Sequence, residues 1–148
     1  MEAEVTPTPR RDKLIIGASG AEVRRASAWL SATCVQRGIP SVQAQRLEIC
    51  LNEVLANVLE HGGGAATAAP ILLQLEVQSA ADAGEARVTV CDAGFAFNPL
   101  SVKMPPRANT LAEARARGMG VTMIRHCSDS LDYRRESGHN HFTFGTRW

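Results

Sequence analysis

Residues 47–64 read LEICLNEVLANVLEHGGG and contain the most regular hydrophobic pattern in the chain. Apolar side chains recur there at intervals of three and four residues, which is the spacing of one face of an α-helix. The residues that follow this spacing are Leu47, Cys50, Leu51, Val54, Leu55, Val58 and Leu59. The pattern predicts an amphipathic helix that packs one face on a core. We expect Ser41 to be its N-cap and the glycines at 62–64 to end it.

Three polar residues accompany this apolar face at a spacing of four, namely Glu53, Asn57 and His61. That spacing places them along one flank of the helix, at the border of the core. The Glu53 carboxylate could orient or deprotonate a hydroxyl group, and the carbonyl oxygen of Asn57 could bind Mg²⁺. A solvated polar face is the alternative for this pair taken alone. His61 either caps the helix C-terminus, where the helix dipole favours a cation, or assists Glu53.

The segments around this helix predict one α/β domain. Alternating or apolar runs indicate strands, and a second apolar stripe indicates another long helix. The expected strands are 13–16, 71–78, 87–91, 131–136 and 141–147, and the other expected helices are 20–37 and 118–127. Residues 93–117 hold three prolines and little periodicity, so we expect a functional loop or lid there. Residues 1–11 are expected to be a flexible N-terminal tail, which leaves 12–148 as the domain.

Composition excludes several classes of protein. The chain has 148 residues, the length of one domain, and its 45% hydrophobic and 21% charged residues are typical of a globular protein. A net charge of +1 argues against a protein that binds the phosphate backbone of nucleic acids. No apolar run approaches the roughly 20 residues of a membrane span. Residues 1–11 also lack the apolar core of a signal peptide, so we expect a cytoplasmic protein.

The cysteines and histidines do not predict a metal site. The cysteines are far apart and form no C-x-x-C pair, so we expect reduced and mostly buried thiols. Three of the histidines lack the spacing of a zinc site, and we expect them to be exposed at strand and helix ends. These residues are Cys34, Cys50, Cys91, Cys127, His126, His139 and His141.

Two glycine-containing motifs add candidate residues. DAG at 92–94 directly follows the strand 87–91. An aspartate there could accept a hydrogen bond from an exocyclic amine such as that of adenine, and the glycine lets a flat base approach the backbone. RGMGV at 117–121 opens a helix, where free backbone amides favour a phosphate. The alternative for the first motif is a plain turn, and the alternative for the second is a flexible turn that leads into the helix. The second motif is neither a dinucleotide fingerprint nor a Walker A loop.

The three motifs, in this order, resemble the N, G1 and G2 boxes of the GHKL ATPases. Residues 52–62, NEVLANVLEHG, are similar to the N-box of the anti-sigma-factor serine kinases of bacterial partner-switching systems. In that family an N-E-x-x-x-N helix ends in a His-Gly or His-Ala pair. GMG at 118–120, with the segments 121–124 and 128–133, is similar to the G2 box and the strand that follows it. The resemblance extends from about Asp12 to Trp148.

This resemblance implies a two-layer α/β sandwich of the GHKL (Bergerat) type, with a mixed, mostly antiparallel sheet and helices on one face. ATP would lie between the helices and the lid. Glu53 would act as general base toward the attacking hydroxyl, Asn57 would bind Mg²⁺, and Asp92 would contact adenine. Either Arg115 or Arg117 would sense the γ-phosphate. The residues expected to bind ATP are Asn57, Asp92, Gly94, Phe97, Arg115, Arg117, Gly118, Met119, Gly120 and Val121.

By the same resemblance, the chain is expected to be an ATP-dependent protein serine kinase and a switch protein. It would phosphorylate a serine of a STAS-domain antagonist and would bind and inhibit a sigma factor or another regulatory protein. A homodimer is expected, with neither nucleic acid nor a membrane as partner. The alternative is an ATP-binding module that sequesters its partner without transferring phosphate, and the retained Glu53 favours the kinase.

The G1 region departs from the family pattern at two positions. Ala96 stands where many GHKL proteins have the second glycine of the box. Members of the kinase family often lack that glycine and carry Phe-Asp-Pro, which is Phe97-Asn98-Pro99 in this chain. We therefore expect Ala96 to be neutral for ATP binding, whereas Asn98 removes one charge from the lid.

Overall fold

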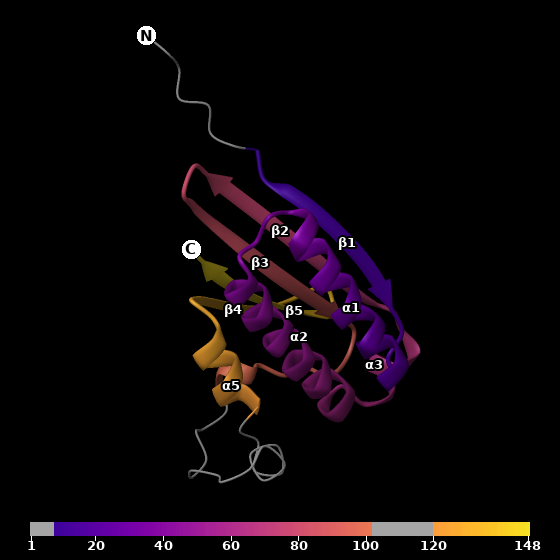
Figure 1. Cartoon of the computed structure of the whole chain (residues 1–148). Coiled ribbons are helices and arrows are strands. Elements are labelled where there is room, and N and C mark those ends of the chain that lie inside the picture. The colour runs from indigo at the N-terminus through magenta and orange to yellow at the C-terminus, as the bar shows by residue number, and fades with distance from the viewer. Residues whose placement is uncertain (1–7, 102–119) are drawn as a thin grey trace, which may run out of the picture.

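The computed structural model describes residues 8–101 and 120–148, which form a two-layer α/β sandwich (Figure 1). One layer is a five-stranded sheet in the order β1-β2-β3-β5-β4. Its strands are β1 (Arg10–Ile16), β2 (Ile71–Ala80), β3 (Ala83–Asp92), β4 (Ser130–Glu136) and β5 (His139–Arg147). The long helices α1 and α2 lie over one face of this sheet (Figure 1). The helices are α1 (Gly20–Gln36), α2 (Ser41–His61), α3 (Gly63–Ala68) and α5 (Gly120–Cys127), with a 3-10 turn at Pro99–Ser101.

The strand pairings of this sheet are all antiparallel, whereas the family resemblance implies a mixed, mostly antiparallel sheet. The connections explain the difference. Hairpins join β2 to β3 and β4 to β5, and a hairpin can only produce antiparallel neighbours. Between β1 and β2 the chain runs along α1 and returns along α2. As a result β2 begins where β1 ends, with Ile71 opposite Ile16. The predicted α/β sandwich is confirmed.

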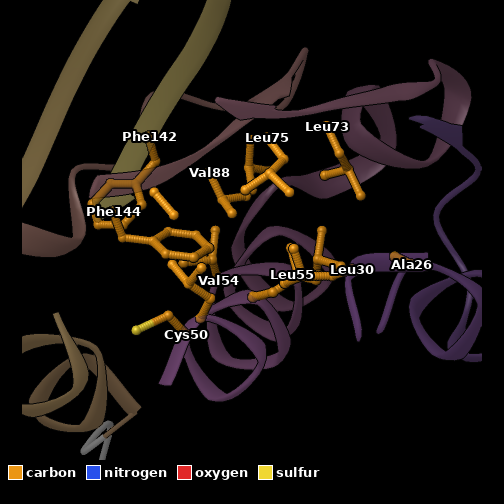
Figure 2. Close-up of a cluster of buried hydrophobic side chains, with 14 of the residues drawn as sticks. Ala26, Leu30, Cys50, Val54, Leu55, Leu73, Leu75, Val88, Phe142 and Phe144 are labelled. Carbon is orange, nitrogen blue, oxygen red and sulfur yellow. The ribbon is translucent and has the colours of Figure 1, made fainter. Parts of the chain in front are cut away.

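The core lies between α2 and the sheet. Six of the seven residues in the predicted apolar stripe of α2 are buried, and Leu59 is partly buried. Figure 2 shows Val54 and Cys50 of α2 on the side of the helix that faces Phe142 and Phe144 of β5. Burying one such aliphatic or aromatic side chain contributes about 1.5–3 kcal/mol. The predicted stripe is therefore the surface that fixes the position of α2.

The ends of the two long helices follow local sequence rules, with one exception. At the start of α1, the Ser19 hydroxyl oxygen accepts a hydrogen bond from the Glu22 N–H at 3.2 Å. For α2 the N-cap is Pro40, so the prediction of Ser41 is wrong. The backbone of Pro40 is extended and its carbonyl accepts from the Ala44 N–H at 2.9 Å, which makes Ser41 the first helical residue. None of the helices within 8–101 and 120–148 is long and apolar enough to cross a membrane.

Strand β1 begins at Arg10, three residues before the predicted start, so residues 10 and 11 of the expected tail belong to the sheet. The pairing with β2 explains this extension, because Arg11 forms an ion pair with Glu76 at 2.8 Å. The next residue, Asp12, is held by both nitrogens of the Arg37 fork at 2.8 Å each. That contact lowers the pKa of the Asp12 carboxyl and joins the start of the sheet to the end of α1.

All four cysteines are free thiols, as the sequence predicts. Cys34 and Cys50 are fully buried, whereas Cys91 and Cys127 are half-buried. Burial disfavours the charged thiolate and raises the pKa of Cys34 to about 11 and the pKa of Cys50 to about 12. The two buried thiols therefore stay protonated at neutral pH and behave as small apolar groups.

Thr146 of β5 offers a test of the packing. It is fully buried, and its hydroxyl has no hydrogen-bond partner within the described part of the chain. Thr146→Val keeps the branched shape and removes the desolvated hydroxyl, so the free energy of unfolding in urea should rise by about 1 kcal/mol.

The matched control is Thr89→Val on the neighbouring strand β3. The Thr89 hydroxyl lies 2.8 Å from the Thr143 hydroxyl, so its loss should lower the free energy of unfolding by about 1 kcal/mol. Equal destabilisation by both substitutions would contradict the assignment of Thr146 as an unpaired group.

Candidate functional site

A narrow slot lies between the C-terminal half of α2 and the segment that follows β3. It is lined by Val54, Asn57, Val58, His61 and Gly62 from α2 and its end, by Asp92, Phe95, Phe97 and Pro99 from β3 and the segment after it, and by Tyr133, Asn140 and Phe142 from β4 and β5. The cavity measures about 20 Å³, room for roughly one water molecule. A flat ligand the size of a purine therefore enters only when the walls move apart.

The Glu53 side chain is buried, with 5% of the residue exposed. A solvated polar face is thereby excluded for this residue. An added Cβ on Gly120 would lie 2.5 Å from Glu53 Oε2, so the carboxylate sits directly against the first residue of α5. The positive end of the helix dipole favours a carboxylate at such a place. The structure thus brings together Glu53 and the start of the G-x-G helix.

Asn57 lies one turn further along α2 and faces the slot. Its Nδ2 atom is buried and has no hydrogen-bond partner among the residues described. An unpaired buried amide costs about 1–3 kcal/mol, and such groups in native proteins call for an explanation, for example a ligand. The unpaired Nδ2 atom therefore fits a residue that donates a hydrogen bond to an acceptor on a ligand.

His61 interacts with an aromatic ring of the slot. Its ring stacks on Phe97 with centroids 4.5 Å apart and an angle of 20° between the planes. Two helical turns, about 12 Å along the axis, separate it from Glu53. His61 lines the slot with its side chain 43% exposed, and Gly62 is the C-cap of α2.

Asp92 faces the slot from the end of β3 and is buried, with 5% exposed. Its Oδ1 atom accepts hydrogen bonds from the Gly94 N–H at 2.9 Å and from Asn140 Nδ2 at 3.2 Å. No hydrogen bond from residues 8–101 or 120–148 reaches Oδ2. One carboxylate oxygen is thus held by the protein, and the other is available to a ligand that donates a hydrogen bond.

The segment after β3 is pressed against the end of α2. An added Cβ on Gly94 would lie 2.7 Å from Gly62 Cα and 3.0 Å from its carbonyl oxygen, so no larger residue fits. The Phe95 N–H donates to the same carbonyl at 3.1 Å. Gly63 has a φ of +67°, and the Phe95 ring covers the place of its missing Cβ. The glycines therefore permit both the close approach and the turn between α2 and α3.

Asn140 is a site residue that the motif analysis does not find. It is buried on β5, and it donates to Asp92 and to the Phe95 carbonyl while it accepts from the Tyr133 hydroxyl at 2.6 Å. Its position in the sequence could have indicated it, because Asn140 alternates with Phe142 and Phe144 and so shares the inward face of β5 with them. A polar side chain on an apolar strand face indicates a buried hydrogen-bond network.

The remaining predicted site residues divide into two groups. Phe97 forms a wall of the slot, and Gly120 and Val121 are buried at the start of α5. Arg115, Arg117, Gly118 and Met119 lie outside the described residues, as does the part of the expected lid from 102 to 117. Within the part of the chain that the structure describes, no three His, Cys, Asp or Glu side chains form a group that could hold a metal ion.

The described groups can recognise a flat, amine-bearing ring joined to an anion. Aromatic and aliphatic side chains line the slot together with Asp92, whose Oδ2 atom accepts no hydrogen bond from the described residues. Asn57 and the buried Glu53 follow along α2 toward the N-terminus of α5, where a phosphate is favoured. The phosphate end of the site is formed by α5, a helix of eight residues whose first two residues, Gly120 and Val121, are buried.

Comparison with known proteins identifies relatives over nearly the whole chain. A family model described as histidine kinase-like ATPase domain matches residues 16–145. The serine/threonine-protein kinase BtrW of Bordetella bronchiseptica is 27% identical over 134 residues, which cover 90% of this chain and 92% of that protein.

Two solved structures share the fold. The RsbU and RsbW domains of a Mycobacterium tuberculosis protein match with a TM-score of 0.64 and 17% identity, over 93% of this chain. The match spans only 32% of that longer chain. The SiaB–SiaC complex of Pseudomonas aeruginosa matches with a TM-score of 0.53 and 10% identity, over 93% of this chain and 89% of the matched chain.

The contact between Gly94 and Gly62 yields a prediction for stability. Gly94→Ala forces a methyl group into the backbone of the α2 end, so the free energy of unfolding in urea should fall by about 1–3 kcal/mol. Gly64→Ala is the matched control, because an added Cβ there meets no atom within 4 Å. It should be neutral or stabilising by up to about 1 kcal/mol, since alanine favours a helix. Wild-type stability of Gly94→Ala would contradict the close contact.

Proposed function

Because the chain belongs to the histidine kinase-like ATPase family, we propose that it binds ATP and transfers the γ-phosphate to a serine of a partner protein. The observation that carries the proposal is the arrangement along α2. The buried Glu53 carboxylate and the Asn57 carboxamide, whose Nδ2 atom has no partner among the described residues, lie one turn apart on α2. Asn57 lines the slot that Asp92 also faces, and Glu53 lies against the first residue of α5. Family membership makes ATP the natural ligand of this arrangement.

Adenine would occupy the slot. Its 6-amino group would donate a hydrogen bond to Asp92 Oδ2, and Gly94 would let the ring approach the backbone. Val54, Val58 and Phe97 would contact the ring faces. Because the slot is narrow in this structure, entry of the base would separate its walls, which include the stacked pair of His61 and Phe97.

The phosphates would lie toward α5. The backbone amides of Gly118, Met119, Gly120 and Val121 would surround them, and Arg115 or Arg117 would contact the γ-phosphate. Asn57 would hold Mg²⁺ through its carbonyl oxygen, and its place on the wall of the slot, one turn of α2 from Glu53, fits that role. Bound Mg²⁺ would supply positive charge that neutralises the phosphate oxygens.

Glu53 would act as the general base. It would accept the proton of the attacking serine hydroxyl as the serine oxygen bonds to the γ-phosphorus, and ADP would leave with the bridging oxygen. Its buried position beside the α5 N-terminus excludes bulk water and keeps the carboxylate close to the phosphate end. Phosphoryl transfer otherwise requires mainly positioning and charge neutralisation.

The partner would be a STAS-domain antagonist that presents the serine, with a sigma factor or another regulatory protein as the second partner of the switch. The relative BtrW is named a serine/threonine-protein kinase, and one similar solved structure is a complex of two proteins, SiaB and SiaC. These names support a kinase that acts by protein–protein contact. We also propose that the protein works in the cytoplasm and as a homodimer. A module that binds ATP and sequesters its partner without phosphate transfer is the second candidate.

Asn57→Ala tests the metal end of the site. It removes the carbonyl oxygen proposed to bind Mg²⁺, so affinity for a non-hydrolysable ATP analogue should fall roughly tenfold or more and lose its dependence on Mg²⁺. Calorimetric titration with and without Mg²⁺ measures both effects.

Asn52→Ala is the control for this experiment. Asn52 lies on the same helix and donates to the Glu48 carbonyl and to Ser27, away from the slot. Its affinity and Mg²⁺ dependence should match the wild type. Unchanged Mg²⁺-dependent binding in Asn57→Ala would show that the assignment of Asn57 is wrong.

Glu53→Gln tests the proposed base. The substitution keeps the size of the side chain and removes its ability to accept a proton, so transfer of ³²P to a STAS partner should slow by about 10²–10⁴-fold. Nucleotide affinity should stay within about threefold of the wild type, because the change removes no proposed ATP contact.

Glu60→Gln on the same helix, whose side chain is 69% exposed, should leave the transfer rate unchanged. Wild-type transfer by Glu53→Gln would exclude Glu53 as the base. A wild-type protein that binds ATP and its partner but transfers no phosphate would instead favour the sequestration module.

A further inference from the structure

Asn140 has a hydrogen-bond partner for every polar position of its side chain. Nδ2 donates to Asp92 Oδ1 at 3.2 Å and to the Phe95 carbonyl at 2.8 Å. Oδ1 accepts from the Tyr133 hydroxyl at 2.6 Å and from the Phe97 N–H at 3.4 Å. The Asp92 carboxylate and the Phe95 carbonyl can only accept hydrogen bonds, so the Asn140 atom that faces both of them must be the amide nitrogen. This determines which way round the amide lies. Asn140 is therefore locked in a single arrangement.

This arrangement fixes the Asp92 carboxylate. The Gly94 N–H and Asn140 Nδ2 both donate to Oδ1, so rotation of the carboxylate would break two hydrogen bonds. Hydrogen bonds to an ionised group are roughly twice as strong as neutral ones. Oδ2 is consequently held in one direction on a residue that lines the slot.

We propose that Asn140 is a positioning residue that selects purines with a 6-amino group, an inference that rests on the proposed ATP site. Tyr133 holds the Asn140 amide, and Asn140 holds Asp92 so that Oδ2 accepts a hydrogen bond from the amine. A purine with a 6-oxo group presents an acceptor to the same oxygen and is repelled. A purine with hydrogen at position 6 loses the hydrogen bond and leaves Oδ2 desolvated.

A purely structural role of Asn140 makes a different prediction. Its contacts with Phe95 and Phe97 also hold the segment that forms one wall of the slot. If these contacts were its only role, removal of the amide would weaken all purine nucleotides to the same extent. Selectivity between two purines separates the roles, because only the positioning role acts through the 6-amino group.

The test compares ADP with purine riboside diphosphate, in which hydrogen replaces the 6-amino group, by calorimetric titration of the full chain. The wild type should prefer ADP about tenfold or more, the range of one hydrogen bond to a charged group. Asn140→Ala should reduce the preference to about threefold or less, mainly through weaker ADP binding. Tyr133→Phe, which keeps the ring in the core and removes only the hydroxyl, should give an intermediate preference.

Thr143→Val is the matched control. It lies on the same strand, faces the opposite side of the sheet and loses one hydrogen bond, the one to Thr89. Its preference for ADP should equal that of the wild type.

Three outcomes overturn the proposal. Equal weakening of both nucleotides by Asn140→Ala, with an unchanged preference, would assign Asn140 a structural role. Equal binding of both nucleotides by the wild type would refute the proposed selection of the 6-amino group without contradicting the proposed ATP site. A wild type that binds neither would refute the proposed function as well. If Asn140→Ala does not fold, the preference of Tyr133→Phe for ADP over purine riboside diphosphate decides between the positioning role and the structural role.

Discussion

The apolar face of α2 packs against β3 and β5, and this contact determines where the functional groups lie. Its buried residues repeat at helical spacing, so they fix the rotation of the helix about its own axis. Glu53 and Asn57 share the helix with this face but lie beside it. They are therefore directed to the edge of the core, toward the slot and the start of α5. A rotation of α2 would expose apolar area and misplace both polar groups.

The opposite wall of the slot depends on a second constraint, the absence of a side chain at Gly94. Backbone contact between Gly94 and Gly62 brings the end of β3 against the end of α2. Asn140 then ties the same segment to β5 and Tyr133. A rigid helix wall thus faces a short segment held by a few hydrogen bonds.

Much of this arrangement is predictable from sequence because it depends on local spacing. The helix α2 and the terminal hairpin follow from periodicity, and the structure confirms them. Motif order predicts Asp92 directly after a strand, and the structure places it as the last residue of β3. The N-cap at Pro40 depends on a backbone conformation that residue type alone does not specify. The pairing of Arg10 and Arg11 with β2 depends on a strand distant in sequence.

Asn140 illustrates what spacing cannot show. Its role follows from the β3–β5 register, which places it opposite Asp92 although 48 residues separate them. No local pattern encodes that pairing. The antiparallel order of the sheet is likewise a property of the connections, since α1 and α2 together return the chain to the end of β1. The roles of Arg115, Arg117, Gly118 and Met119 remain predictions from the motif.

The central claim is that adenine binds in the slot between α2 and the segment after β3. The most direct measurement is NMR detection of nuclear Overhauser effects between bound ADP and side chains of the uniformly labelled protein. We predict contacts from adenine H2 and H8 to the methyl groups of Val54 and Val58 and to the ring of Phe97. The assignment of the site would be contradicted if, at saturating ADP, the adenine protons showed nuclear Overhauser effects to other side chains and to none of these three.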